Sequence, residues 1–349
     1  MRITHVALVA ATALSFLFAA GCGTKTTSSQ TIDGERLGLF KPLPEALPVS
    51  AGGAEAEREA LGRMLYFDAR LSKSQTISCN SCHKLDAYGV DNEVTSEGHK
   101  GQRGDRNSPT VYNAAAHFVQ FWDGRAPNVE AQAKGPVLNP VEMGMASGTQ
   151  VVAVLKSMPE YVAAFKKAFH GQKDPVTFDN AANAIGAFER KLLTPSRWDK
   201  FLKGDQTALT AQEKAGFNVF YETGCETCHA GALLGANMYQ KLGNVKPYPD
   251  TSDPGRFKVT KEDGDRMIFK VPSLRNVEKT APYFHNGKVT RIEDAIAQMA
   301  DYQLGRKLSS EEIASIATFL RSLTGEIPAD LVKPPTLPQS TPRTPKPEA

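Results

Sequence analysis

The chain is best understood from one stretch of its sequence, Cys79-Asn80-Ser81-Cys82-His83. This C-x-x-C-H motif is the attachment signature of a c-type haem, because two thiols bond to the porphyrin's vinyl groups and the adjacent imidazole reaches the iron. A second copy, Cys225-Glu226-Thr227-Cys228-His229, stands far downstream. A single copy is also compatible with a Cys/His zinc site or with disulfides, but two copies favour two covalently bound haems.

The bulk composition narrows the class of protein. A length of 349 residues suggests two ordinary domains, and a hydrophobic content of 41% is enough for real cores. The formal net charge of +3 is too small to argue for a nucleic-acid partner. The chain has 5 cysteines, and all except Cys22 belong to the two motifs, so none is left to build a disulfide framework.

The N-terminus has the features of a signal peptide: a short basic start, an apolar run from Val6 to Ala20 and small residues before Cys22. The run is too short for a comfortable membrane span. The sequence Ala19-Ala20-Gly21-Cys22 resembles a bacterial lipobox, which predicts a lipidated Cys22 at the mature N-terminus. The alternative is an ordinary cleaved signal. Both alternatives predict a location on the periplasmic side of a bacterial membrane, either lipid-anchored or soluble.

Apolar residues at helical spacing predict a mainly helical fold. Helices are expected from Glu55 to Phe67, from Thr149 to Phe169 and from Phe178 to Leu192. Strand patterns are few, although the loop-rich segment from Tyr239 to Val271 has room for a short hairpin. We therefore predict an all-α fold with long loops and little strand.

Capping boxes mark the expected helix starts in the second half, because a Ser or Thr and a Glu three residues later satisfy each other's backbone groups. They are Thr210 with Glu213, Thr290 with Glu293, and Ser309 with Glu312. Gly325 is expected to end the last helix.

The predicted domain boundaries follow composition and helix breaks, with Pro195 interrupting the helical pattern at the domain junction. They give a signal peptide at 1–21, a lipoprotein tether rich in Thr, Ser, Gly and Pro at 22–53, haem domains at 54–195 and 196–327, and a Pro-rich tail at 328–349. The tail is expected to be extended or disordered.

A helix after the second motif offers a thioether. Met299 shares an inward helix face with Ile296, and Met as an axial ligand raises the potential of a c-type haem. A Met at this spacing more often fills a core. Met238 and Met267 also follow His229. Small cytochromes place this ligand well after the motif, which favours Met299 over Met238.

Several longer motifs occur in order between residues 57 and 325. They are LGRMLYFDARLS, RNSPTVYN, QFWDGRAPNVEAQAKGPVLNPVEM, the stretch from Gly224 to His229, FKVPSLRNVEKTAPYFHNG and AIAQMADYQLG. Together these motifs resemble the bacterial di-haem cytochrome c peroxidase family. The resemblance implies two cytochrome c-like domains: 54–195 with a low-potential, peroxidatic haem, and 196–327 with a high-potential haem at which electrons enter.

The resemblance also implies roles for individual residues at the two irons. The attachment thiols are Cys79, Cys82, Cys225 and Cys228, and the iron ligands are His83, His99, His229 and Met299. His99 matches a loop histidine that caps the peroxidatic haem until the other haem is reduced, which makes it a redox-coupled gate. Without the family, a histidine in such a charged loop is more often solvated.

The implied chemistry is the reduction of hydrogen peroxide, which needs an open iron and a proton-transfer group. Gln120 and Glu130 match the family's distal pair: Glu130 would transfer the proton and Gln120 would orient the peroxide. Ordinary roles for them are a polar residue at a helix edge and a surface carboxylate. Arg125 is only a weak substitute for the distal arginine of plant-type peroxidases.

Further implied features lie between the domains. Asn107, Thr280 and Pro282 match a calcium site made by one side chain and two backbone carbonyls, although Asn and Thr are also common turn residues. An aromatic residue is expected between the haems, and the candidates are Tyr112, Trp122 and Trp198. His285 matches a histidine near the second haem and receives no ligand role.

The implied electron donor is a small cytochrome c or cupredoxin, and the resemblance allows a homodimer. Two alternatives stay open. A non-enzymatic di-haem electron shuttle would make the Gln120 and Glu130 pair incidental. A related di-haem enzyme that oxidises a protein substrate has a Tyr in place of the Met ligand; Met299 argues against it, although Tyr302 lies nearby.

Overall fold

The computed structural model of the protein describes residues 31–48 and 54–348. The predicted signal peptide and the candidate lipidation site Cys22 lie outside these residues. Within them, no helix combines the length and the apolar character that a membrane span requires.

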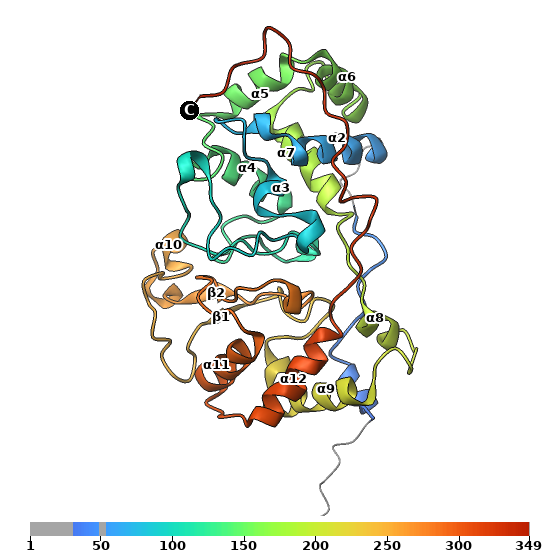
Figure 1. The fold of residues 1–349 in the computed structure, drawn as a ribbon, viewed down its shortest axis with the longest axis vertical. Helices are drawn as coiled ribbons and strands as arrows, with labels where there is room; N and C mark the ends of the chain where they lie inside the picture. Colours follow the sequence, from blue (N-terminus) through green and yellow to red (C-terminus); the bar gives the residue numbers. More distant parts are fainter. Residues whose placement is uncertain (1–30, 49–53, 349) are drawn as a thin grey trace, which may run out of the picture.

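The described chain forms two lobes stacked along the long axis of the molecule (Figure 1). The N-terminal lobe contains α2 (Glu55–Phe67), α3 (Cys79–Cys82), α4 (Val129–Leu138), α5 (Gly148–Lys156), α6 (Pro159–Ala168) and α7 (Phe178–Glu189). The C-terminal lobe contains α8 (Arg197–Leu202), α9 (Ala211–Thr223), α10 (Phe257–Thr260), α11 (Ile292–Leu304) and α12 (Ser310–Arg321). The predicted mainly helical fold is confirmed.

The core of the N-terminal lobe is built where α2 packs against α7. Gly62 makes this close packing feasible, because a Cβ at this position would lie 1.9 Å from the carbonyl oxygen of Ala184. Leu61, Leu65 and Ile185 are buried at the contact. The bounds of α2 agree with the helix predicted from its apolar spacing.

The core of the C-terminal lobe surrounds Trp198, which is completely buried. Its indole packs edge-on against Phe319 at 5.2 Å and against Phe40 at 5.6 Å, measured between ring centroids. Helices α9 and α12 bring the apolar faces of this core together.

Some predicted helix ends are right and others are wrong. The capping boxes of Thr210 with Glu213 and of Ser309 with Glu312 are present at the starts of α9 and α12. The predicted box of Thr290 with Glu293 is wrong, because α11 begins one residue later, after Arg291, with no side-chain cap.

The helix predicted from Thr149 to Phe169 is in fact two helices. Ser147 caps α5, and Pro159 begins α6. Proline has no backbone N–H and its ring clashes with the preceding turn, so one continuous helix through this point is unfavourable. The last helix ends at Arg321, before the predicted stop at Gly325.

One short hairpin confirms the predicted hairpin in the loop-rich segment. Strands β1 (Tyr239–Lys241) and β2 (Ile268–Lys270) pair antiparallel, with Tyr239 opposite Lys270. The hairpin lies on the side of the C-terminal lobe that faces the N-terminal lobe (Figure 1).

The described part of the predicted tether is folded onto the C-terminal lobe. Residues 31–48 include α1 (Gly34–Leu37), Phe40 is buried in the core around Trp198, and the N–H of Leu43 donates to Asp199 at 2.7 Å. The prediction of a tether is therefore wrong over 31–48, because apolar side chains among the Pro and Gly residues supply burial energy that composition alone hides.

The Pro-rich tail is ordered and returns to the N-terminal lobe (Figure 1, red). Leu331 is buried beside Tyr66, the Gln75 side chain donates to the Pro345 carbonyl at 2.7 Å, and the Glu348 N–H donates to the Lys73 carbonyl at 2.9 Å. The tail is extended, as predicted, but not disordered: both side-chain and backbone groups of the N-terminal lobe form hydrogen bonds with its backbone.

Two candidate haem sites

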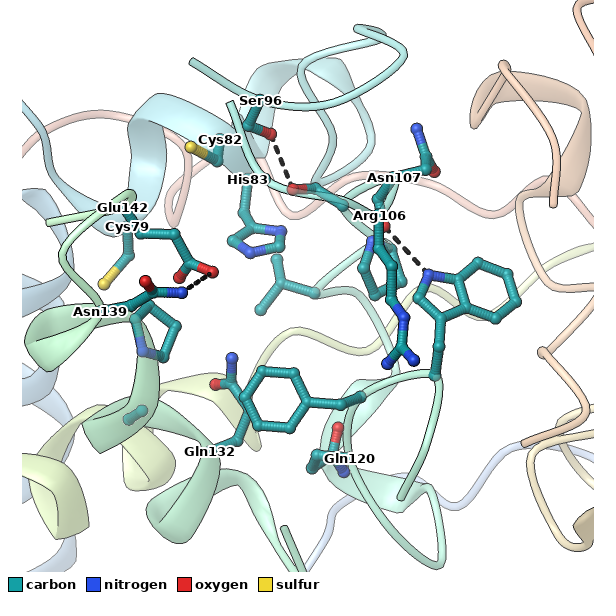
Figure 2. A pocket seen from close by; sticks show the side chains of 18 of the residues that line it. Cys79, Cys82, His83, Ser96, Arg106, Asn107, Gln120, Gln132, Asn139 and Glu142 are labelled. Atoms are coloured by element: carbon teal, nitrogen blue, oxygen red, sulfur yellow. Dashed lines mark hydrogen bonds between the residues drawn. The ribbon is translucent and has the colours of Figure 1, made fainter. Parts of the chain in front are cut away.

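The first C-x-x-C-H motif opens onto a cavity of about 650 Å³ in the N-terminal lobe (Figure 2). Cys79, Cys82 and His83 line it, and α3 carries the two thiols. The hydroxyl of Tyr66 donates to the backbone carbonyl of His83 at 2.7 Å and thereby fixes the end of the motif. Figure 2 shows the imidazole of His83 directed into this cavity, where it can reach a metal.

The second motif lines a cavity of about 260 Å³ in the C-terminal lobe, together with Met299 from α11. Nδ1 of His229 lies 3.0 Å from the carbonyl oxygen of Leu234. This hydrogen bond selects the tautomer that leaves Nε2 free for a metal. Gly235 has a φ of +124°, and a Cβ there would lie 2.2 Å from the Pro272 carbonyl oxygen, so only glycine suits this turn beside His229.

Burial sets the protonation of both motifs. It lowers the pKa of His83 and of His229, which favours the neutral imidazole that binds metals. It raises the pKa of the Cys79 and Cys225 thiols to about 12. Both motifs thus combine the donors for a c-type haem with a largely apolar cavity, so the residues present fit two such haems.

Only one member of the distal pair predicted from the sequence lies at the first cavity. Glu130 does not line the first cavity; its carboxylate is ion-paired with Arg190 and packs against Gly186 of α7. Gln120 does line the cavity, but its side-chain amide donates to the Ala114 carbonyl at 2.8 Å.

The structure instead places Gln132 and Glu142 together on the wall of the first cavity (Figure 2). This pair has the same sequence spacing as Gln120 and Glu130. Successive helix residues are rotated by about 100°, so Glu130 and Gln132 point in different directions from α4. The cavity-lining residues of α4 are Gln132, Ala133 and Pro136, which lie on one side of the helix. The spacing of the buried positions Val129 and Ala133 does not by itself separate Gln132 from Glu130, because each lies one residue from a buried position.

Glu142 has the electrostatics of a proton-transfer group. Burial raises its pKa, whereas a hydrogen bond from Asn139 and the positive charge of Arg125 act in the opposite direction. The Asn139 side chain donates to its Oε1 at 2.8 Å. Gln132 stays neutral at any pH and can only orient a ligand by hydrogen bonding.

His99 is buried outside the first cavity in this conformation. Its ring lies against Gly144, whose φ is +72° and whose Cβ would come within 3.1 Å of the imidazole. The backbone N–H of His99 donates to the Glu142 carbonyl at 2.7 Å. Ligation of iron by His99 therefore needs a second conformation of this loop.

Among the three aromatic candidates, Trp122 lies at the wall shared by the two cavities. Its Nε1 donates to the Asn107 carbonyl at 3.0 Å. Trp198 belongs to the core of the C-terminal lobe, and Tyr112 is buried behind the first motif, with its hydroxyl donating to the Leu85 carbonyl.

The remaining predicted residues gather at the interface between the lobes. Asn107 lines both cavities, and Thr280 and Pro282 line the second. The Asn107 side chain donates to the Glu93 carbonyl at 2.9 Å. His285 stacks on Phe269 with ring centroids 4.3 Å apart, and burial lowers its pKa to about 4.

Two half-buried C-x-x-C-H motifs, each opening onto its own cavity, define a di-haem c-type protein. The chain belongs to the di-haem cytochrome c peroxidase family. The model of that family, described as "Di-haem cytochrome c peroxidase", matches residues 56–207.

Curated relatives and a solved structure agree with this assignment. The chain is 47% identical to the Cytochrome c551 peroxidase of Pseudomonas aeruginosa, covering 93% of this chain and 94% of that protein. It is 46% identical to the Cytochrome c551 peroxidase of Nitrosomonas europaea, covering 88% and 90%. The crystal structure of a MauG-like protein associated with microbial copper homeostasis superposes with a TM-score of 0.71 at 27% identity, covering 87% of this chain and 98% of that one.

Proposed function

We propose that this protein reduces hydrogen peroxide to water at the first cavity, with electrons received from a small cytochrome c or cupredoxin at the second. The observation that carries the proposal is an asymmetry between the cavities. Met299 occupies the second cavity beside His229, whereas Glu142 and Gln132 line the first beside His83. A non-enzymatic shuttle has no use for a buried acid and amide at one haem.

A c-type haem supplies the iron that binds and reduces peroxide, and the chain supplies orientation and proton transfer. Glu142 accepts a proton from the near oxygen of peroxide and returns it to the departing oxygen, so that water leaves. Such general acid–base groups contribute typically about 10²–10⁴-fold. Gln132 holds the peroxide by hydrogen bonding, and the positive charge of Arg125 partly offsets the effect of burial by favouring the ionised carboxylate.

We assign Trp122 to the electron-transfer route between the two haems, because its side chain borders both cavities. We assign His99 as the gate: its ring would ligate the first iron in the resting enzyme, and on release it would lie against Gly144, as it does in this structure. Met299 would be the second ligand of a high-potential haem held in the second cavity. Its position also argues against the relative that oxidises a protein substrate with a Tyr at this site.

Calcium, membrane attachment and assembly belong to the same proposal. A calcium ion between the lobes would take the Asn107 side chain and the backbone carbonyls of Thr280 and Pro282. Export to the periplasm and lipidation of Cys22 rest on the N-terminal sequence, and a homodimer rests on the family alone.

The test is peroxide-dependent oxidation of a reduced small cytochrome c by the holoprotein, measured by stopped-flow absorbance before and after half-reduction. Mass spectrometry first establishes two covalent haems per chain. Rapid turnover after half-reduction supports the proposal. Two low-spin haems that never bind peroxide in any redox state would establish the electron shuttle instead.

A further inference from the structure

The wall shared by the two cavities contains an unusual pair of basic side chains, Lys270 and His117. Both residues line both cavities. Lys270 is only 5% exposed, and its Nζ lies 2.9 Å from Nδ1 of His117. Lys270 ends strand β2, and its backbone N–H donates to the Trp122 carbonyl at 2.8 Å, so the pair is held at the junction of the lobes.

The pair has no counter-charge from the described chain. Burial alone lowers the pKa of Lys270, to about 8, and no carboxylate of the described residues forms an ion pair with it. The nearby acids Asp123 and Asp253 are already bound by Arg106. Buried charges in proteins are normally paired, so an anion from outside the chain is expected here.

The geometry also defines the donors that this anion would meet. Burial and the neighbouring Lys270 hold the pKa of His117 well below its usual range, so its ring is neutral. Its Nδ1 accepts from Lys270, which places the ring hydrogen on Nε2. Nε2 is buried and has no hydrogen-bond partner among the described residues. The pair therefore offers an ammonium and a ring N–H, both donors, to one acceptor.

We propose that Lys270 and His117 bind the carboxylate of a haem propionate at the wall between the two cavities. The inference rests on the two haems of the proposed function, whose propionates are their anionic groups. Vinyl and propionate groups lie on opposite edges of a porphyrin, so attachment at the cysteines directs the propionates away from the motifs. Propionates from the first and second haem have the same chemistry, and the experiment separates them.

The pairing has a redox consequence. Reduction adds an electron to a haem, so a nearby positive charge stabilises the reduced form, and an uncompensated propionate destabilises it. Removing the Lys270 charge should therefore lower the reduction potential of the haem whose propionate it binds. Both potentials should fall if propionates of both haems meet at the wall.

The experiment compares Lys270→Met with Lys241→Met in the holoprotein by spectroelectrochemical titration and resonance Raman spectroscopy. Lys241 is exposed on β1 of the same hairpin and lines neither cavity, so it controls for loss of one charge. Lys270→Met should lower the reduction equilibrium constant of at least one haem about tenfold, which is about 59 mV for one electron. The propionate bending bands of that haem should also shift in the resonance Raman spectrum. Lys270→Arg should keep the reduction equilibrium constants of both haems within about threefold of wild type.

The proposal fails if Lys270→Met matches Lys241→Met in both potentials and in the propionate bands. Where Lys270→Met does not assemble with haem, Lys270→Arg and His117→Gln decide: unchanged propionate bands in both overturn the assignment, and a shift in either supports it. A wild-type protein that fails to turn over peroxide would refute the proposed function, but it would leave these potentials and bands to be measured.

Discussion

The side-chain amide of Asn139 donates a 2.8 Å hydrogen bond to Oε1 of Glu142, and so holds this carboxylate at the wall of the first cavity. Both residues belong to the loop that follows α4. Burial favours the protonated carboxyl, and the amide favours the carboxylate. A group under two opposing influences of this kind can accept a proton and return it.

Replacement of Glu142 by Gln should abolish proton transfer while preserving shape and hydrogen bonding. We expect peroxide turnover to fall by about 10²–10⁴-fold, with both haems and both potentials retained. Steady-state kinetics on the half-reduced enzyme measure this effect. Because Glu142 acts in its ionised form, wild-type turnover should also decline as pH falls through its raised pKa, and this limb should be absent in the variant.

The matched control is Glu130→Gln, which removes a carboxylate paired with Arg190 outside the cavity. It should change kcat by less than about threefold. An equal loss in both variants, or a loss under about threefold in Glu142→Gln, would remove Glu142 from the mechanism.

Met299→His tests the asymmetry between the cavities. A thioether ligand stabilises ferrous iron relative to imidazole, so only the higher of the two potentials should fall, by at least about 59 mV, a tenfold change for one electron. Redox titration followed by absorbance measures both haems. Met267→Leu is the control, because Met267 is buried in the same lobe but lines neither cavity. Unchanged potentials would make Met299 a core residue.

The parts of the site that a local pattern determines were predictable from the sequence. Both C-x-x-C-H motifs were found in this way, since their spacing is set by bond geometry. The helix face of Met299 was also found, and Met299 lines the second cavity, but its role as an iron ligand rests on the family resemblance and stays a prediction. The distal pair was missed, because choosing between Glu130 and Glu142 needs the rotation of α4 and the course of the loop after it. Those depend on long-range contacts, such as the ion pair between Glu130 and Arg190, the residue that follows α7.

The tail and residues 31–48 were mispredicted for a different reason. Composition describes what a segment does alone, whereas Leu331 and Phe40 gain their stability from pockets made by distant parts of the chain. Long-range packing of this kind leaves no periodic trace in a Pro-rich sequence.

Leu331→Ala measures how much the returning tail stabilises the N-terminal lobe. Truncating a buried Leu costs about 2–5 kcal/mol, so thermal unfolding of the holoprotein should begin at a lower temperature. Differential scanning calorimetry is the measurement, and exposed Thr336→Ala in the same tail is the control. If the two variants unfold alike, the tail lies on the lobe without stabilising it.

An ion pair between the lobes predicts a dependence of stability on pH. Burial raises the pKa of Asp253, but the hydrogen bonds and charge of Arg106, 2.6 Å away, outweigh it and hold the pKa at about 2. The unfolded value is about 3.9. Because the pKa of Asp253 is lower in the folded than in the unfolded protein, its carboxylate stabilises the fold above about pH 4. This stabilisation is lost as pH falls towards 2.

Asp253→Asn should therefore be less stable than wild type at neutral pH, by about 2–3 kcal/mol for a carboxylate whose pKa falls by about two units on folding, because Arg106 keeps Asp123 as its second partner. The difference should shrink between about pH 4 and pH 2. Calorimetry across this range provides the test, with exposed Asp263→Asn as the control for loss of a carboxylate. If the stability difference between Asp253→Asn and wild type stays constant over this pH range, the pKa of Asp253 does not change on folding and the prediction is wrong.

Two substitutions, His99→Gly and Gly144→Ala, test whether His99 caps the peroxidatic haem. Removing the imidazole in His99→Gly should leave the peroxidatic haem high-spin in the oxidised protein and make peroxide turnover independent of pre-reduction. Gly144→Ala should act in the opposite direction, because its Cβ would crowd the ring at 3.1 Å and strain a residue at φ +72°. That variant should favour the capped form and activate more slowly. Electron paramagnetic resonance and stopped-flow kinetics measure both effects, with exposed His170→Gly as the control. A His99→Gly protein that stays low-spin, or that still needs half-reduction, would show that another group caps the haem.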